Sequence, residues 1–316
     1  MVHLKTLVAV LILVFCAMSA PKTSADNNGG VPALFSFGDS ILDTGNNNLL
    51  ITLTKGNYPP YGRDFPGGIP TGRFCNGRNP SDLIAEALGV KATVPAYLGG
   101  SLRDEDLPTG VTFASGGSGI DPVTSGIQGV LSLSSQLRLF EQYIERLKAL
   151  VGEERASYIV SHALVLYSSG NNDIAITYYD TLTHLQPFSI YSDGLVSGSS
   201  KFIMSLYGLG VRRMWVFSTL PLGCLPGGRT IAGGPLRFCA PIVNLQAQFF
   251  NAKLASAVSS IRSRYPDFDI RVCRRLRGVL RDCSFWSFRI MYHAKCVSRS
   301  FHIRFLGFCA SNGESL

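Results

Sequence analysis

The sequence predicts a doubly wound α/β/α sandwich built on a mostly parallel sheet. Short apolar runs alternate along the chain with amphipathic stretches of helical period, and this alternation is typical of βαβ units. An apolar leader of 25 residues leaves about 290 residues, the size of one α/β domain with insertions. The runs expected to form successive strands are residues 33–37, 111–114, 163–167, 214–218 and 268–272.

Three stretches between these runs predict helices that can cover both faces of the sheet. Asn79 can cap a helix that begins at Pro80 and stops at Gly89. Two further helices are indicated by apolar residues at helical spacing. The first stripe consists of Leu137, Phe140, Ile144, Leu147 and Val151. The second stripe consists of Ile242, Leu245, Phe249, Ala257, Val258 and Ile261.

The first 25 residues have the pattern of a secretory signal peptide. They combine Lys5, an apolar core from Leu7 to Met18 and a small-residue end at Ala25. The apolar core is shorter than the ~20 residues that span a bilayer, so we expect no transmembrane anchor. The chain is therefore expected to be secreted and extracellular.

Cysteine usage fits an oxidising compartment. Of the 8 cysteines, Cys16 lies in the leader, and the remaining odd number leaves at least one without a partner in the chain. Cys224 and Cys239 bracket a loop rich in proline and glycine and are the first pair expected to form a disulfide. Two free, buried thiols are the alternative.

A lone serine stands where the first apolar run meets a polar loop. Residues 34–48 are LFSFGDSILDTGNNN, and Ser40 follows the run after Gly38 and Asp39. Open α/β sheets bind ligands in the crevice at the carboxyl ends of their strands, so the Ser40 hydroxyl is expected there. Free backbone N–H groups in such a loop can hold a developing oxyanion. Ser40 is the candidate nucleophile, and a strand-to-turn junction without chemistry is the alternative.

Two further loops follow predicted strands in the same way. Residues 110–119 are GVTFASGGSG, whose glycines let the backbone approach a substrate closely. Residues 168–173 are SSGNND and directly follow the run 163–167. A phosphate cradle is disfavoured for the first loop, because it lacks both the lysine of a P-loop and the G-x-G-x-x-G spacing. The three loops together indicate one site at the edge of the sheet.

These blocks, with STLPLGCLP at 218–226, resemble the plant GDSL esterase/lipase family of the Ser-Gly-Asn-His (SGNH) hydrolase superfamily over residues 33–270. The resemblance implies a flavodoxin-like SGNH hydrolase fold, and hydrolysis of carboxylic or acyl-lipid esters without a metal or organic cofactor. It also implies that Ser40 is the nucleophile and forms the oxyanion hole with Gly117 and Asn172. Thr112 departs from the family, which usually has asparagine there.

The general base and its acid are not identified in the sequence. The family carries a C-terminal Asp-x-x-His for this purpose, and no such motif occurs here. The late histidines are His293 and His302, preceded three residues earlier by Ile290 and Arg299. A serine without a base is weakly nucleophilic. The missing motif therefore implies impaired catalysis, and a catalytically inactive secreted binding protein is the alternative.

Two earlier histidines remain as candidates for the base. His162 directly precedes a predicted strand, at the end opposite the Ser40 loop, and is expected to be an ordinary histidine. His184 lies in a loop beyond Asn172, from which it could approach the site.

The sequence divides into a leader (1–25), a hydrolase domain (26–270) and a divergent basic tail (271–316). The net charge of +8 is concentrated in the tail, which holds 9 basic and 2 acidic residues against 20 and 19 in residues 1–270. One hypothesis is a terminus replaced by an out-of-frame or spliced product, and the other is a segment that makes weak contact with an anionic surface. The expected partner is a small-molecule or lipid ester, and secretion argues against nucleic acid.

Overall fold

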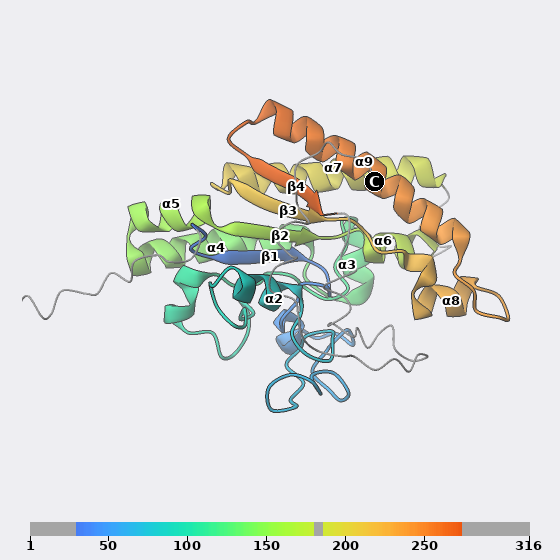
Figure 1. The fold of residues 1–316 in the computed structure, drawn as a ribbon, viewed down its shortest axis with the longest axis horizontal. Helices are drawn as coiled ribbons and strands as arrows, with labels where there is room; N and C mark the ends of the chain where they lie inside the picture. Colours follow the sequence, from blue (N-terminus) through green and yellow to red (C-terminus); the bar gives the residue numbers. More distant parts are fainter. Residues whose placement is uncertain (1–29, 180–185, 274–316) are drawn as a thin grey trace, which may run out of the picture.

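A parallel sheet of four strands lies at the centre of the computed structural model, which describes residues 30–179 and 186–273 (Figure 1). The strands are β1 (Leu34–Gly38), β2 (Leu164–Ser168), β3 (Arg213–Phe217) and β4 (Asp269–Cys273), in the spatial order β1-β2-β3-β4. Leu34 pairs with Leu164, and Val165 with Met214. Four of the predicted strands are thus confirmed to within one residue at each end.

The remaining predicted strand, 111–114, joins the sheet beside β1 through a single isolated bridge. Thr112 bridges Ser36 in parallel orientation, and the Phe113 N–H donates to the Ser36 carbonyl over 2.7 Å. Thr112 is bridged on both sides, to Ser36 and to Ala96, and the side-chain amide of Asn46 binds the carbonyls of Thr112 and Ala114 at 3.0 and 2.7 Å, but the segment does not extend into a regular strand. The prediction of a regular strand at this position is therefore wrong.

Helices connect the strands throughout the described ranges. They are α2 (Pro80–Ala87), α3 (Pro122–Gln128), α4 (Leu133–Val151), α5 (Glu153–His162), α6 (Asn171–Ala175), α7 (Phe188–Gly208), α8 (Pro226–Ala232) and α9 (Pro241–Arg264). Short 3-10 helices are η1 (Asn46–Leu49), η2 (Asp104–Thr109), η3 (Thr177–Tyr179) and η4 (Leu222–Cys224). The predicted α2 begins as expected, because the Asn79 side chain accepts from the Asp82 N–H and Pro80 occupies its first turn.

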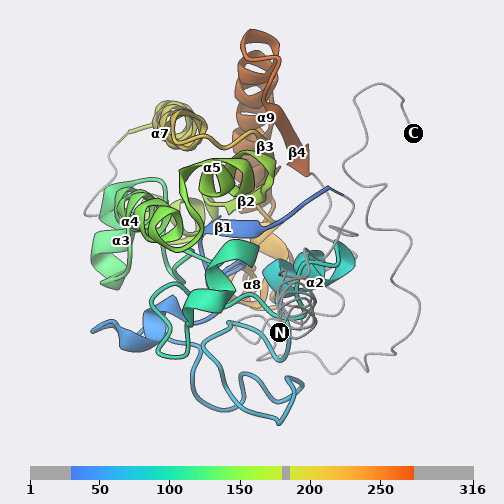
Figure 2. The ribbon, with the colours of Figure 1, turned by 90° about the vertical axis from the view of Figure 1, so that its left-hand side faces the viewer.

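Helices lie on both faces of the sheet (Figure 2). Successive residues of a strand point to opposite faces. Phe37 of β1 contacts Phe140 of α4 and Phe202 of α7, with ring centroids 5.3 and 5.7 Å apart. On the opposite face, the Ser36 and Ser81 hydroxyls of β1 and α2 lie 2.9 Å apart. The predicted doubly wound α/β class is confirmed.

The predicted stripe of helix α9 is confirmed in part, because Val258 is buried and Ile261 packs against the core, whereas the first three residues of the stripe are exposed. Its buried residues are Val243, Ala247, Phe250, Leu254 and Val258. Ile242 and Leu245, which were expected in the core, are 67% and 63% exposed, and Phe249 is 43% exposed. The error arose because apolar residues occupy both faces of this helix, so helical spacing alone could not identify the buried one. The α4 stripe is confirmed in part, with Phe140 and Leu147 buried and Leu137, Ile144 and Val151 packed at the edge of the core.

The predicted disulfide between Cys224 and Cys239 is present and ties the start of the α8 region to the segment before α9. Strand β4 runs through the expected boundary at residues 270 and 271. The signal peptide (1–25), His184, His293, His302 and the tail from residue 274 lie outside the described residues. Among the helices that are described, none is long and apolar enough to cross a bilayer.

Candidate active site

Ser40 follows the carboxyl end of β1 through a glycine that no other residue can replace without strain. Gly38 has φ of +116°, and a Cβ there would lie 1.7 Å from the Ser168 carbonyl oxygen. Its backbone N–H donates to the side-chain oxygen of Gln136 over 2.8 Å, and the Gln136 amide donates back to the Gly38 carbonyl over 3.0 Å. The close approach of β2 and this two-bond clamp fix the turn that presents Ser40.

Gln136 was not singled out in the sequence, although a signal for it exists. It lies on the buried face of α4, which is otherwise apolar, between Leu133 and Phe140. A buried polar side chain on an apolar helix face must find hydrogen-bond partners. Besides Gly38, the Gln136 amide donates to the Ser118 hydroxyl over 3.1 Å. Gln136 therefore joins the Ser40 turn to the glycine-rich loop.

Asp39 anchors the same turn to two other elements. Its carboxylate accepts from the Ile41 N–H, from the Ser168 hydroxyl at the end of β2, and from the Asn171 amide at the start of α6, at 2.9 to 3.1 Å. Ser40 itself is half-buried. Within the described part of the chain, neither its hydroxyl nor its N–H has a hydrogen-bond partner. The backbone is thus fixed while both Ser40 groups stay available to a ligand.

The glycine-rich loop is held by side chains that follow Ser40 in the chain. Asp43 accepts from the Gly116 N–H over 2.9 Å, and the Asn47 amide donates to the Gly116 carbonyl over 2.8 Å. Gly117 has φ of +85°, and its N–H has no hydrogen-bond partner among the described residues. The Thr112 hydroxyl donates to the Leu42 carbonyl over 3.0 Å, so the loop keeps a side-chain anchor where the family usually has asparagine.

The third loop is bound to the second through Asn172 and Asp173. The Asn172 amide donates to the Ser118 carbonyl over 2.8 Å. Asp173 accepts from the N–H groups of Ile120 and Asp121, at 2.9 and 2.8 Å. Since an amide carries two N–H donors, Asn172 retains one for a ligand.

Ser40, Gly117 and Asn172, predicted from three separated blocks, line one cleft of about 950 Å³. The cleft lies at the carboxyl ends of the strands, where the sequence placed it. Its walls are largely apolar, and side chains on them include Leu53, Tyr58, Phe74, Ile176, Leu220 and Ile231. Donor groups on one side and an apolar wall on the other suit an ester with an apolar acyl group.

No histidine from the described residues lines the cleft, so none of them supplies the general base. His162 is the one histidine in the described ranges, and it ends α5 just before β2, at the opposite end of the sheet. Its ring stacks on Tyr158 and its Nδ1 lies 3.0 Å from the Ser161 hydroxyl. The expectation that His162 is an ordinary histidine away from the Ser40 loop is confirmed.

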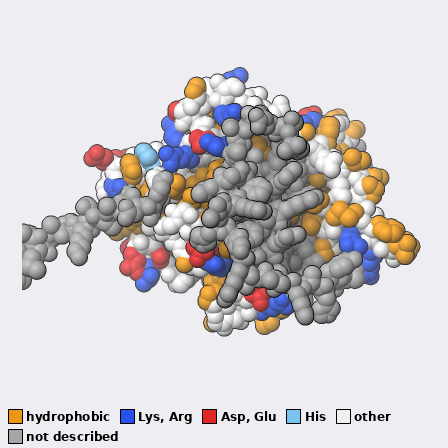
Figure 3. Space-filling model, in the orientation of Figure 1, with side chains coloured by type: hydrophobic (Ala, Val, Ile, Leu, Met, Phe, Trp, Pro, Cys, Tyr) orange, Lys and Arg blue, Asp and Glu red, His pale blue; other side chains and the backbone are white. Residues whose placement is uncertain are grey.

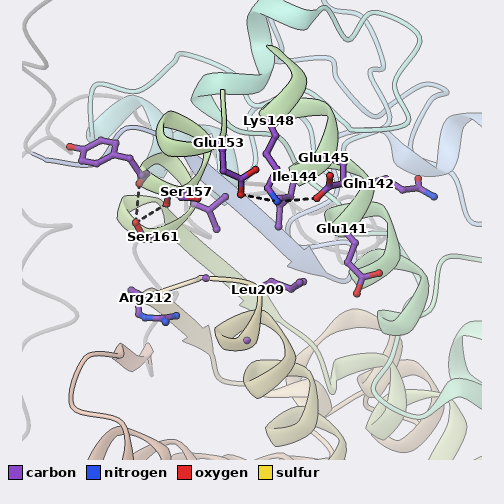
Figure 4. Close-up of a pocket in the computed structure, with 15 residues that line it drawn as sticks. Glu141, Gln142, Ile144, Glu145, Lys148, Glu153, Ser157, Ser161, Leu209 and Arg212 are labelled. Atoms are coloured by element: carbon purple, nitrogen blue, oxygen red, sulfur yellow. Dashed lines mark hydrogen bonds and ion pairs between the residues drawn. The ribbon is translucent and has the colours of Figure 1, made fainter. Parts of the chain in front are cut away.

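A second cleft lies at that opposite end, between α4, α5 and residues 208–212 (Figure 4). Its charged groups pair with each other, because the Lys148 ammonium lies 3.1 Å from both the Glu145 and the Glu153 carboxylates. Ser157 and Ser161 lie on its wall, and the Ser161 hydroxyl lies 3.0 Å from His162 Nδ1 but donates to the carbonyls of Ser157 and Tyr158. Neither serine stands in a glycine-rich loop with free backbone N–H groups like the one around Ser40.

The three buried carboxyls of the site predict a pH-dependent stability. Burial raises the pKa of Asp39, Asp43 and Asp173 from 3.8 to about 6, although hydrogen bonds to each favour ionisation. The folded chain therefore binds more protons than the unfolded chain between these values. Their contribution to stability is full below about pH 4 and is lost as the pH rises through about 6.

From about pH 4 to about pH 7, the free energy of unfolding should therefore fall by about 3 kcal/mol less in the Asp39→Asn variant than in the wild type. Urea unfolding at both pH values measures this difference. Glu141→Gln, which changes an exposed carboxylate on α4, is the control and should keep the wild-type dependence. An equal fall in the free energy of unfolding of Asp39→Asn and the wild type would contradict the raised pKa of Asp39.

Comparison with known proteins gives one consistent answer. The family model described as GDSL-like Lipase/Acylhydrolase matches residues 34–301, extending past Ile270 into the tail. The Arabidopsis thaliana protein GDSL esterase/lipase At5g42170 is 44% identical over 282 residues, covering 88% of this chain and 76% of the relative. GDSL esterase/lipase EXL3 is 49% identical over 238 residues (75% and 65%), and GDSL esterase/lipase At3g14820 is 43% identical over 289 residues (90% and 82%), both from the same plant.

Proposed function

The chain belongs to the GDSL-like lipase/acylhydrolase family of ester hydrolases, and on that premise we propose that Ser40 forms an acyl-enzyme with carboxylic or acyl-lipid esters. The observation that carries this proposal is the cleft in which Ser40, Gly117 and Asn172 meet. The apolar wall of the cleft supports an acyl group as the bound part of the substrate.

The chemistry requires attack, collapse and hydrolysis. The Ser40 oxygen attacks the ester carbonyl carbon, and the serine proton passes to a base. The tetrahedral intermediate then collapses, the ester C–O bond breaks, and the alcohol leaves with a proton. Water attacks the acyl-enzyme in the same manner and releases the carboxylic acid, which regenerates Ser40.

Three donors are available for the oxyanion of the intermediate. They are the N–H groups of Ser40 and Gly117, which have no partner among the described residues, and the second N–H of the Asn172 amide. Because the hydrogen bonds of Asp43, Asp173 and Gln136 already fix these loops, little reorganisation is needed when the charge develops.

Proton removal from Ser40 is the weak step. The lining of the cleft contains no histidine from the described residues, so we assign the serine proton to a base from solvent. An oxyanion hole and substrate binding alone support roughly 10³ to 10⁴-fold acceleration over water. We propose a slow ester hydrolase whose rate is limited by its missing base.

Added imidazole is expected to rescue this step. The cleft has room for a small base beside a substrate, and a well-placed general base contributes roughly 100-fold or more. We expect saturating imidazole to raise the hydrolysis of p-nitrophenyl butyrate by about 100-fold. The rate of imidazole alone is subtracted, and release of p-nitrophenol is followed by absorbance.

Variants of His184, His293 and His302 decide whether the chain supplies its own base. His184→Ala, His293→Ala and His302→Ala should each leave both the slow rate and the rescue unchanged. A fast rate without imidazole that any of these variants abolishes would overturn the proposal of a missing base. That result would not contradict the role of Ser40 as the nucleophile.

We also propose that the chain is exported through residues 1–25. The disulfide between Cys224 and Cys239 supports this, because disulfides persist mainly in oxidising compartments. Expression in plant cells should deliver to the medium a chain whose N-terminal sequencing begins at Asp26. Retention in the cell of a chain that still carries Met1 would contradict export.

The missing base also favours a second candidate function. A secreted family member that binds acyl esters without turning them over would keep the cleft and the oxyanion donors. The two functions differ in whether Ser40 can be made to react, which covalent labelling measures directly.

A further inference from the structure

An exposed apolar surface extends from α8 to the first turns of α9. Its residues are Ile231, Leu236, Phe238, Ile242, Leu245 and Phe249, which are 85%, 74%, 65%, 67%, 63% and 43% exposed. Ile242, Leu245 and Phe249 follow the helical spacing of one outward face of α9. Figure 3 shows orange side chains gathered over the end of the molecule that carries α8 and the start of α9. We call these six residues the α8–α9 surface.

A second apolar rim faces it across the Ser40 cleft. Leu49, Ile51 and Leu53, in and after η1, are 68%, 102% and 99% exposed. Leu53 from this rim and Ile231 from the α8–α9 surface both line the cleft that holds Ser40. Exposed apolar side chains therefore stand on both sides of the candidate active site. Contiguous exposed apolar surfaces on a soluble fold mark places where a partner binds.

The charge of these segments identifies the kind of partner. No acidic residue occurs between Asp193 and Asp267, a stretch that includes the whole α8–α9 surface. The same stretch contains basic residues, among them Arg229 just before that surface and Arg237 between two of its members. Around the second rim, no acidic residue occurs between Asp43 and Asp64, while Lys55 lines the cleft. The nearby Asp193 carboxylate is paired with Lys253, whose ammonium lies over the Phe249 ring. Apolar side chains in segments with basic and no acidic residues fit an anionic lipid surface.

We infer that the α8–α9 surface and the rim at Leu49, Ile51 and Leu53 seat the protein on an anionic lipid surface. In this seating the apolar side chains enter the acyl boundary of the lipid layer and the basic groups face the headgroups. The cleft between the two rims then opens toward the lipid. The binding does not depend on whether Ser40 reacts.

Vesicle flotation of the processed chain from Asp26 tests the inference. The chain should float with phosphatidylcholine vesicles that contain about one third phosphatidylglycerol, and less with phosphatidylcholine alone. Raising the ionic strength should weaken the binding, because salt screens the headgroup charge. Ile242→Gln/Leu245→Gln should weaken the partitioning about tenfold, since two exposed side chains lose their apolar character.

The matched control is Leu150→Gln, which changes a leucine that is 44% exposed at the end of α4, outside both rims. It should alter the partitioning less than twofold. Ser40→Ala should bind vesicles as the wild type does, which separates this inference from the proposed hydrolysis.

Three results would overturn the inference. The first is a wild type that floats with neither vesicle. The second is a loss of binding in Leu150→Gln equal to that in the double variant. The third is a concentration-dependent dimer that Ile242→Gln/Leu245→Gln disrupts while vesicle binding is absent, because a second copy of the chain would then cover the surface.

Discussion

Replacing Ser40 by alanine is expected to abolish the imidazole-dependent hydrolysis of p-nitrophenyl butyrate, a loss of about 100-fold at saturating imidazole. Imidazole acts by taking the proton from the Ser40 hydroxyl, so it has no target once that hydroxyl is removed. The slow rate without imidazole should fall as well, because the proposed acyl-enzyme forms on the Ser40 oxygen.

The wild type and Ser40→Ala are compared at the same imidazole concentrations, with imidazole alone subtracted. Ser134→Ala, which removes another serine hydroxyl from the first turn of α4, is the control and should retain the full rescue. A Ser40→Ala variant that is rescued as well as the wild type would show that imidazole acts without Ser40.

Replacing Asn172 by alanine is expected to slow the imidazole-supported reaction about 100-fold. The amide is held by the Ser118 carbonyl and lines the cleft with Ser40, so its second N–H is available to the oxyanion. That bond is stronger in the transition state than in the ground state. The loss should therefore fall on kcat and leave KM nearly unchanged.

Asn57→Ala is the matched control for Asn172→Ala. Asn57 is an exposed asparagine outside the cleft lining, and its removal should change neither constant. An Asn172→Ala variant that retains kcat, or whose whole effect lies in KM, would contradict an oxyanion role for this amide.

The strands and the three loops could be predicted because short-range patterns specify them. Ser40 and Asn172 lie in loops that directly follow apolar runs, and parallel strands bring their carboxyl ends to one edge. The regular strand expected at 111–114 was wrong for a long-range reason. Thr112 is bridged to Ser36 and to Ala96 and is backed by the Asn46 side-chain amide, and nothing near 111–114 indicates these distant contacts.

Two other features depended on packing that the sequence does not display. The face that α9 buries at its start could not be identified from spacing, because Ile242 and Val243 are both apolar and only the packing of this end of α9 beside η4 selects Val243. The role of Gln136 could not be predicted, because its hydrogen-bond partner Gly38 lies 98 residues earlier in the chain.

The loops around Ser40 are linked by buried hydrogen bonds rather than by direct contact of the three candidate residues. Asp43 ties the Ser40 loop to Gly116, and Asp173 ties the Asn172 loop to Ile120. Buried polar networks of this kind rigidify a site when every member has a partner. The arrangement keeps the oxyanion donors in place even though the described cleft contains no histidine.

The most direct test of the account is covalent labelling of the folded chain by a fluorophosphonate, with the adduct located by peptide mass spectrometry. The reagent reacts only with an activated serine, and its phosphonyl oxygen needs the same donors as an ester oxyanion. We expect slow labelling of Ser40 alone, accelerated by imidazole and slowed in Asn172→Ala. No adduct at Ser40 with imidazole present, or equal labelling of other serines, would contradict it.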